Sequence, residues 1–312
     1  MKITESFGIR YPILQGGMAW VAEARLAAAV SNGGGLGLIA AGSADADFVR
    51  AQIRQARDLT DKPFGVNVML MNPAVDDVMQ VVCDERVPLV TTGAGNPGKY
   101  VAALKGAGTK VVPVVSNVAL AIRLARVGAD ALIAEGLEGG GHIGELTTMA
   151  LVPQVVDAVD IPVLAAGGIG DGRGVAAAFL LGASGVQVGT RFLVAEECQV
   201  AQAYKDRVIA AKDSDTVVTG RNTGHPVRVL KNKLAREALK MEKEDISLEE
   251  YEAYLSGTLR KAVVDGDTDY GSLMSGQIAG LVGKTQPAAG IIEEMFSEAR
   301  ELLSAAGGLC AW

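Results

Sequence analysis

The stretch EGLEGGGHIGELTT, residues 135–148, holds His142, one of only two histidines in the chain, among closely spaced glycines. Glycine loses more conformational entropy on folding than other residues, so such a run indicates a sharp turn or a close approach to a ligand. A histidine titrates near neutral pH and can deliver a proton to a substrate. The alternative is an ordinary loop histidine that is hydrogen-bonded to the backbone.

Two further glycine positions suggest an anion site. Gly167-Gly168 and Gly189-Thr190 each end a short apolar run and lead into helical sequence. Backbone N–H groups that no Cβ obstructs can point at a phosphate, especially beside a helix N-terminus. Tight turns are the alternative for either pair alone, but the joint occurrence of the two pairs favours a phosphate site.

The elements that must position these residues form a repeat of strands and helices. Continuous rather than alternating apolar runs are typical of strands that are buried on both faces, as in parallel sheets. Amphipathic helical stretches separate them, which indicates βαβ units. Eight such units predict an α/β fold of the (β/α)8 TIM barrel type rather than an open doubly wound sheet. The predicted strands are residues 11–17, 36–42, 63–70, 88–95, 110–117, 130–136, 161–169 and 185–192.

An insertion interrupts the repeat before its last helix. Residues 200–265 are more charged and are predicted to form a mainly helical insertion or lid, and IIEEMFSEARELLSAA is predicted to be the closing helix. We therefore expect the barrel over 1–199, the insertion over 200–265, and a return to the barrel over 266–312.

The active site of such a barrel lies at the carboxyl ends of its strands. The two glycine pairs then occupy the loops after strands 7 and 8, where many barrels bind phosphate. The ends carry few acid–base groups, which suits a flat cofactor such as flavin mononucleotide (FMN) that brings its own reactivity. Asn67 is positioned to bond its ring, and His142 lies in the longest loop. The candidate residues are Gly16, Gly17, Met18, Asn67, Glu135, Gly167, Gly168, Gly189 and Thr190.

Composition excludes other classes. The net charge of −7 argues against nucleic acid as a partner. Cys83, Cys198 and Cys310 lie far apart without metal-ligand spacing, which is typical of reduced thiols in the cytoplasm. The first residues lack the apolar run of a signal peptide, and no apolar stretch is long enough to span a membrane. We expect a cytoplasmic homodimer with no metal site and no membrane partner.

The motifs together resemble one family. QGGMAWVA, FGVNVML and GGHIGELTT occur jointly, and in this order, in the flavin-dependent enoyl-acyl carrier protein reductases of the FabK type. That type belongs to the nitronate monooxygenase-like (2-nitropropane dioxygenase-like) FMN barrels. The resemblance runs from about residue 3 to residue 284.

The resemblance implies a reaction, namely reduction of the trans-2,3 double bond of an enoyl thioester in fatty-acid elongation. It implies that NADH or NADPH reduces FMN, that acyl carrier protein carries the substrate, and that His142 acts on the enolate side. It implies FMN contacts by the strand-end residues named above and by the segment MSGQ, through Met274, Gly276 and Gln277. Members are also often stimulated by a monovalent cation, for which the sequence indicates no site.

A basic run at residues 225–245 leaves two interpretations open. A charged helix face is usually just solvated, but this one could dock the acidic acyl carrier protein. His225, before a proline, is interpreted as a turn residue or as part of a lid. The basic residues are Arg228, Lys231, Lys233, Arg236, Lys240 and Lys243.

Three rival functions remain at this point. A nitronate monooxygenase would share the barrel, FMN and His142 but would use oxygen and need no nicotinamide. A non-redox phosphate barrel, such as an isomerase or lyase, would be colourless and would need a lysine or carboxylate at the rim. A non-catalytic flavin-binding protein would be coloured but inert.

Overall fold

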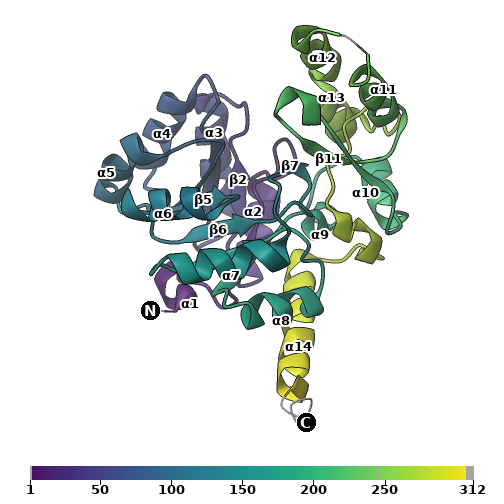
Figure 1. The fold of residues 1–312 in the computed structure, drawn as a ribbon. Coiled ribbons are helices and arrows are strands. Elements are labelled where there is room, and N and C mark those ends of the chain that lie inside the picture. The colour runs from purple at the N-terminus through teal and green to yellow at the C-terminus, as the bar shows by residue number, and fades with distance from the viewer. Residues whose placement is uncertain (1, 245, 307–312) are drawn as a thin grey trace.

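The computed structural model describes residues 2–244 and 246–306, in which eight parallel strands form one closed sheet (Figure 1). The bonds from Gln15 N–H to Leu36 O (3.0 Å) and from Leu36 N–H to Ile13 O (2.9 Å) join the two ends of the sheet. The predicted (β/α)8 TIM barrel is confirmed. Its strands are β1 (Ile13–Gln15), β2 (Leu38–Ala40), β3 (Gly65–Met69), β4 (Leu89–Gly93), β5 (Lys110–Val115), β6 (Leu132–Glu135), β8 (Val163–Ala166) and β9 (Gly185–Val188).

Helices surround the barrel and follow its strands in order. The last of them, α14 (Ala288–Ala306), packs against the helices α8 and α2 and so closes the ring, as predicted. It is drawn in yellow in Figure 1. The others are α2 (Ala24–Asn32), α3 (Ala46–Leu59), α4 (Val75–Asp84), α5 (Gly98–Gly106), α6 (Val118–Arg126), α7 (Thr148–Ala158) and α8 (Gly172–Leu180).

The barrel interior is apolar at one end and polar at the other. Leucines and valines from alternate strand positions form one buried cluster, and Ile3 and Phe7 of the short helix α1 (Ile3–Phe7) join it. One step further along the strands, the sheet register aligns Ala40, Asn67 and Thr91 across β2, β3 and β4. The carboxyl end of the barrel therefore presents small and polar side chains above a packed core.

A second lobe, drawn in green in Figure 1, stands over that end. Three antiparallel strands run through it in the order β10 (Thr216–Thr219), β11 (Val227–Leu230) and β7 (Gly141–His142). The insertion is thus not only helical, because it contains two of these strands. Its helical segments are α10 (Gln202–Ile209), η1 (Arg221–Thr223), α11 (Lys233–Met241), α12 (Leu248–Leu255), α13 (Thr258–Arg260) and η2 (Lys261–Asp265), and η3 (Gln277–Leu281) leads back to the barrel.

Three local predictions were wrong. The strand predicted to end at Phe192 stops at Val188, and α9 (Thr190–Leu193) follows. The basic run begins in strand β11 before it enters α11. The stretch 135–148 is not a free loop, because β7 anchors it to the second lobe. Cys310 lies outside the described residues.

Candidate active site

The ends of β1, β3 and β9 meet tightly at the barrel mouth. A Cβ at Gly17 would lie 2.2 Å from Asn67 Cβ, and one at Gly16 would lie 3.3 Å from Gly189 Cα. Met18 belongs to the same group, because its sulfur lies 3.6 Å from the Cβ position of Gly189. Glycine is required at position 17 because any side chain there would overlap Asn67.

In the side-chain amide of Asn67, the oxygen is hydrogen-bonded to a residue that the structure describes and the nitrogen is not. Its Oδ1 accepts a hydrogen bond from Thr91 Oγ1 at 2.8 Å. That bond fixes the amide so that Nδ2 is the remaining donor, and Nδ2 has no acceptor within the described part of the chain. The structure therefore leaves an oriented amide NH2 group as donor for a ligand at the mouth.

Glu135 ends β6 beside Ala166 of β8 and is half-buried. Its carboxylate lacks a hydrogen-bonding partner among residues 2–244 and 246–306, and an added Cβ at Gly139 would lie 3.4 Å from Glu135 Oε1. Burial raises the pKa of this carboxyl to about 7. Glu135 is consequently a weak acid that is partly protonated near neutral pH.

The loop that carries His142 is held at its base by Glu138 and Thr148. The Glu138 carboxylate accepts the Thr148 N–H at 3.0 Å, and the Thr148 hydroxyl lies 2.9 Å from Gly167 O. Gly136 packs into this group, since a Cβ there would lie 2.1 Å from Thr148 Oγ1. The loop is thereby fixed to the end of β8.

His142 itself lies in β7, where it is paired with Val227 of β11. Its side chain is exposed. The pKa of His142 is lowered first by partial desolvation of the imidazole beside the second lobe and, second, by the charge of His225. The strand pairing that orients this histidine was not predicted from the sequence.

The segment MSGQ, residues 274–277, contacts the end of β9 and the loop after β6. Gly276 N–H donates to Thr190 Oγ1 at 2.9 Å, and Gln277 N–H donates to Glu138 O at 2.9 Å. Met274 lies on the far side of the same loop, with its sulfur 3.5 Å from the Cβ position of Gly141. These contacts join the end of β9 to the His142 loop.

The glycines after β8 and β9 form the predicted turn geometry. Gly167 and Gly168 have φ angles of +84° and +71°, a region that favours glycine. The backbone N–H groups of Gly168, Gly189 and Thr190 have no acceptor in the described ranges 2–244 and 246–306. The loops after β8 and β9 therefore carry several backbone donors that no described residue accepts.

The helix N-terminus after β8 does not contribute to that site. Asp171 Oδ1 accepts from Arg173 N–H, and Glu298 Oε2 accepts from Gly172 N–H at 2.7 Å. Because protein carboxylates already occupy these donors, an anion must use the preceding glycine loop and the start of α9. This corrects the expectation that α8 would present its own N-terminus.

Sequence reasoning missed Glu138, Thr148 and Arg228, whose side chains hold the loop. Arg228 was assigned to an exposed basic surface, yet it is 5% exposed and donates to Leu137 O from Nε and Nη2 at 3.2 and 3.1 Å. No local signal identified its burial, because alternation with Val227 and Val229 places Arg228 on the face opposite these apolar residues.

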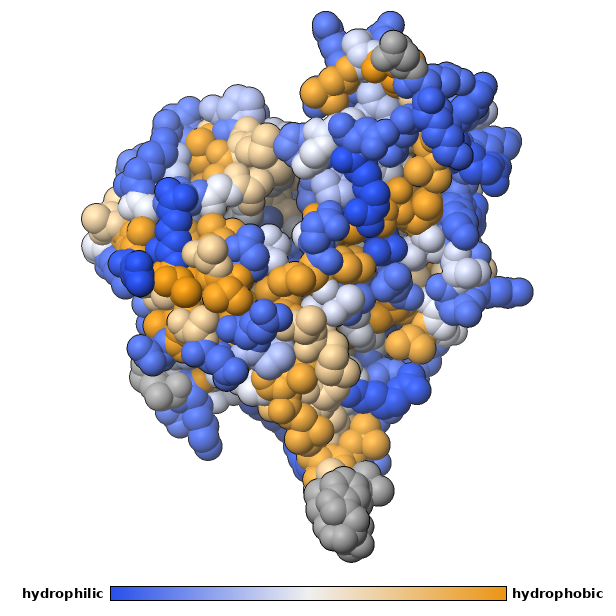
Figure 2. All heavy atoms as spheres, in the orientation of Figure 1, coloured by the Kyte–Doolittle hydropathy of each residue, from blue (hydrophilic) through white to orange (hydrophobic). Residues whose placement is uncertain are grey.

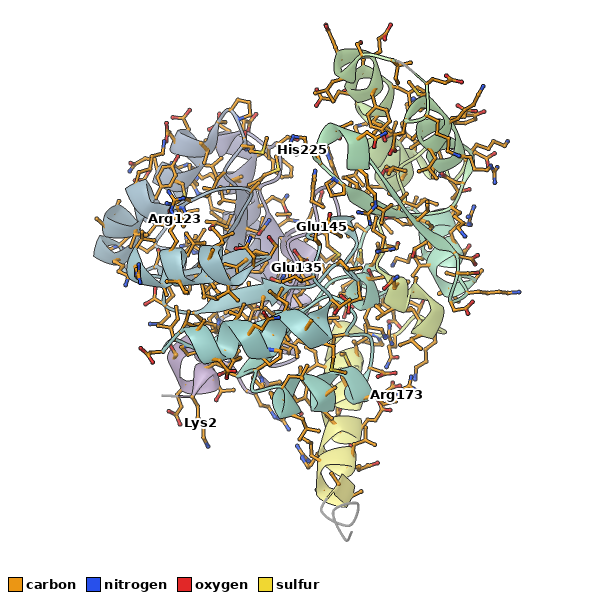
Figure 3. All side chains as sticks on the ribbon, viewed as in Figure 1. Lys2, Arg123, Glu135, Glu145, Arg173 and His225 are labelled. Atoms are coloured by element: carbon orange, nitrogen blue, oxygen red, sulfur yellow. The ribbon has the colours of Figure 1, made fainter. Side chains whose placement is uncertain are left out.

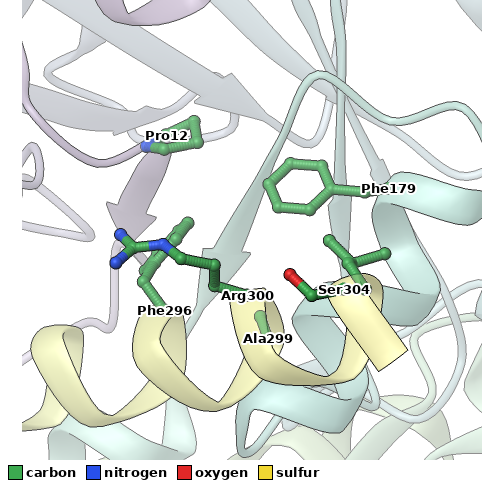
Figure 4. A pocket seen from close by; sticks show the side chains of 7 residues that line it. Pro12, Phe179, Phe296, Ala299, Arg300 and Ser304 are labelled. Atoms are coloured by element: carbon green, nitrogen blue, oxygen red, sulfur yellow. The ribbon is translucent and has the colours of Figure 1, made fainter. Parts of the chain in front are cut away.

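The mouth is an open hollow rather than an enclosed cavity. Figure 2 shows the surface hollowed between the barrel and the second lobe, and in Figure 3 Glu135, Glu145 and His225 lie along this boundary. A cavity of about 440 Å³ lies instead between α8 and α14, lined by Phe179, Phe296 and other residues (Figure 4). It is near Pro12, which precedes β1, and so belongs to the opposite end of the barrel.

Neither a metal centre nor a membrane span is found in the described residues. They contain no group of three His, Cys, Asp or Glu side chains able to hold a metal ion. None of the described helices combines the length and apolar character needed to cross a bilayer.

Comparison with known proteins places this geometry in a family. The family model for nitronate monooxygenase matches residues 1–82 and 75–298. The structure of FabK from Thermotoga maritima is 51% identical, with 98% of each chain covered and a TM-score of 0.96.

Two curated relatives also match along the whole chain. One is named as a dehydrogenase of a hydroxy-methyl-oxo-octahydroindene-carboxyl-CoA and comes from Mycobacterium tuberculosis. It is 37% identical, with 98% of both chains covered. A probable nitronate monooxygenase of Staphylococcus saprophyticus is 35% identical, with 97% of this chain and 98% of the relative covered. This chain is a member of the nitronate monooxygenase family.

Proposed function

We propose that this protein is an FMN-dependent enoyl-acyl carrier protein reductase, which uses NADH or NADPH to reduce the trans-2,3 double bond of an enoyl thioester. The observation that carries the proposal is the 51% identity with FabK from Thermotoga maritima over 98% of both chains. The name of the mycobacterial relative describes a CoA thioester as its substrate, which supports the same substrate class.

The residues at the mouth fit FMN. Free backbone N–H groups of Gly168, Gly189 and Thr190 suit its phosphate. A Cβ at Gly93 would meet no atom within 4 Å, so the end of β4 leaves open space for a flat ring, and Asn67 Nδ2 supplies a donor beside it. Bound FMN would pass the hydride of the nicotinamide to the β carbon of the substrate.

In this proposal His142 provides the matching proton. The substrate gains a hydride at its β carbon and a proton at its α carbon, and His142 is an exposed titratable group of the anchored loop. Glu135, with its pKa raised to about 7 by burial, would be partly protonated beside the cofactor near neutral pH. Activation by a monovalent cation and assembly as a homodimer are part of the same proposal.

The test is anaerobic oxidation of NADH in the presence of crotonyl thioester. We expect NADH consumption that depends on the thioester and continues without oxygen.

The second candidate, nitronate monooxygenase, is favoured by the family match and by the staphylococcal relative. Oxygen uptake with an alkyl nitronate, together with no thioester-dependent NADH consumption, would establish that function instead.

The cofactor gives a prediction of its own. The purified protein should be yellow and should release FMN, not FAD, on denaturation, because the mouth offers one cluster of free backbone donors for one phosphate. Chromatography of the released flavin checks this. Release of FAD, or a protein that takes up no flavin on reconstitution, contradicts the proposal.

We further propose that acyl carrier protein docks on the exposed basic surface of α11 and the loops flanking it. Lys233 is already paired with Asp269, and Lys240 is paired with Glu244. Within residues 2–244 and 246–306 the side chains of Arg236 and Lys243 have no ion pair, and both are exposed. Lys231 is exposed and unpaired too, but its ammonium group donates to Ser214 O, so Arg236 and Lys243 are the cations of this surface with neither bond among the described residues.

The double substitution Arg236→Glu with Lys243→Glu should weaken turnover of carrier-bound substrate about tenfold at low salt, because charge complementarity mainly speeds association. Turnover of a small thioester should stay unchanged. Arg123→Glu with Arg126→Glu on α6 is the matched control, since it makes the same charge change on the exposed surface of the barrel. Equal effects on both substrates would identify the α11 surface as merely solvated. Steady-state kinetics at two salt concentrations make the comparison.

A further inference from the structure

The two histidines of the chain, 83 positions apart in the sequence, meet at one edge of the small sheet. His142 of β7 is paired with Val227 of β11. The pairing continues beyond the strand, because Ile143 N–H donates to Pro226 O at 3.1 Å. His225 is the residue before Pro226, so the same ladder brings it to the His142 loop.

The strand geometry puts both imidazoles on one face. Residues directly opposite in an antiparallel pair share a face, so His142 and Val227 do. A residue before proline is biased toward extended backbone, and side chains two positions apart along an extended segment point the same way. His225 thus becomes the diagonal neighbour of His142, at a separation of roughly 7–8 Å between such positions. Figure 3 places His225 at the edge of the second lobe, above Glu145.

The charged groups around this edge are held by other partners. Arg221 of η1 pairs with Glu145 at 3.4 Å, and the Glu242 carboxylate accepts from Gly220 N–H at 2.7 Å and from the Tyr251 hydroxyl at 2.8 Å. Arg228 is opposite Gly141 in the register and therefore points to the other face. In the described part of the chain, neither imidazole ring has an ion pair or a hydrogen bond.

We propose that His225 is a functional residue of this site, a titrating partner of His142, such that a proton on either imidazole disfavours a proton on the other. His225 is a positioning residue in this sense, since it acts through His142 and not on the substrate. The link to turnover rests on the proposed role of His142 as proton donor. The lowered pKa of His142, to which the charge of His225 contributes after burial, agrees with the coupling.

The coupling has a defined effect on activity. A proton donor loses activity as the pH rises through its pKa. Removing the charge of His225 raises the pKa of His142, so His225→Gln should shift the alkaline fall in turnover to higher pH. His225→Lys, which keeps a permanent charge at this position, should shift it to lower pH.

The experiment is an NMR titration of the flavin-bound protein with ¹⁵N-labelled histidine, which has two imidazoles to resolve in the whole chain. His225→Gln should raise the titration midpoint of His142. His225→Lys should lower the midpoint of His142. The control Arg123→Gln, on the exposed surface of α6, should move neither.

An unchanged His142 midpoint in both His225 variants, with an otherwise wild-type amide spectrum, would overturn the coupling. The titration does not depend on turnover, so the two proposals fail separately. Coupled midpoints in a protein without thioester-dependent NADH consumption would refute the proposed reaction and leave the histidine pair intact. Normal turnover with uncoupled midpoints would do the reverse.

Discussion

His142→Ala should lower thioester-dependent NADH consumption by about a hundredfold or more, which is the usual contribution of a general acid. The same variant should stay yellow. The backbone donors of Gly168, Gly189 and Thr190, which are proposed to hold the phosphate, belong to other loops and do not involve the imidazole. Turnover per bound flavin, obtained from the NADH rate and the flavin absorbance, is the measurement.

The fold should tolerate this change. The His142 side chain is exposed, and its ring makes no hydrogen bond in the described residues, so the free energy of unfolding should change by no more than about 0.5 kcal/mol. Glu145→Ala, three residues along the same rim, is the matched control and should retain most of the activity. Loss of FMN from the variant would make His142 a structural residue. Full activity would remove it from the chemistry.

The barrel could be predicted from the sequence because its signals are local. Each strand is a short apolar run that ends in glycine or a polar residue, and burial on both faces makes the run continuous. The closing helix α14 was equally visible, since its apolar residues recur at helical spacing over nineteen residues. The start of α9 was not, because Val186, Val188 and Phe192 recur at even spacing, which is compatible with a continued strand as well as with a helix.

The sequence indicates which residues lie at the barrel mouth, but not the hydrogen bonds between them. Gly17, Asn67 and Gly189 follow from the rule that barrel strands end at the active site. The bond between Gly276 N–H and Thr190 Oγ1 joins residues 86 positions apart, and no local pattern indicates it. Likewise, Asp171 and Glu298 accept the free N–H groups at the start of α8, and the contact with Glu298 becomes visible only in the tertiary structure.

The strand β7 shows why the rest could not be predicted. It consists of Gly141 and His142, which have no intrinsic preference for a strand. It exists because β11 pairs with it, and β11 lies in a run whose charges suggested a helix surface. Side-chain burial depends on the partner strand, so Arg228 could not be distinguished in advance from the exposed Lys231 and Lys233.

Arg228 supports the largest structural prediction. Its Nε and Nη2 donate to Leu137 O, and its Nη1 donates to Thr216 Oγ1 at 3.3 Å. Burial lowers the pKa of this guanidinium, which pairs with neutral oxygens and no carboxylate. The side chain therefore joins β11 and β10 to the loop that carries His142.

Arg228→Met should release that loop and leave the barrel folded. Methionine keeps the apolar stem but removes the donors to Leu137 O, and hydrogen bonds to charged groups contribute about 1.5–3 kcal/mol. The amide of Ile143, which donates to Pro226 O, should then exchange with solvent roughly ten to a hundred times faster. Turnover should fall by about tenfold or more, since a small misplacement of a catalytic group is costly. Hydrogen exchange and steady-state kinetics measure the two effects.

Two further variants separate the role of the guanidinium from its charge. Arg228→Lys keeps the charge but cannot donate from two nitrogens at once in the same fork geometry, so it should restore little of the protection at Ile143. Arg207→Met, in the same lobe, removes a single bond to Lys231 O at 2.8 Å and should leave Ile143 protected. Full protection in Arg228→Met would show that backbone pairing between β7 and β11 alone holds the loop. Rescue by lysine would show that positive charge, and not the paired bonds to Leu137 O, orients His142.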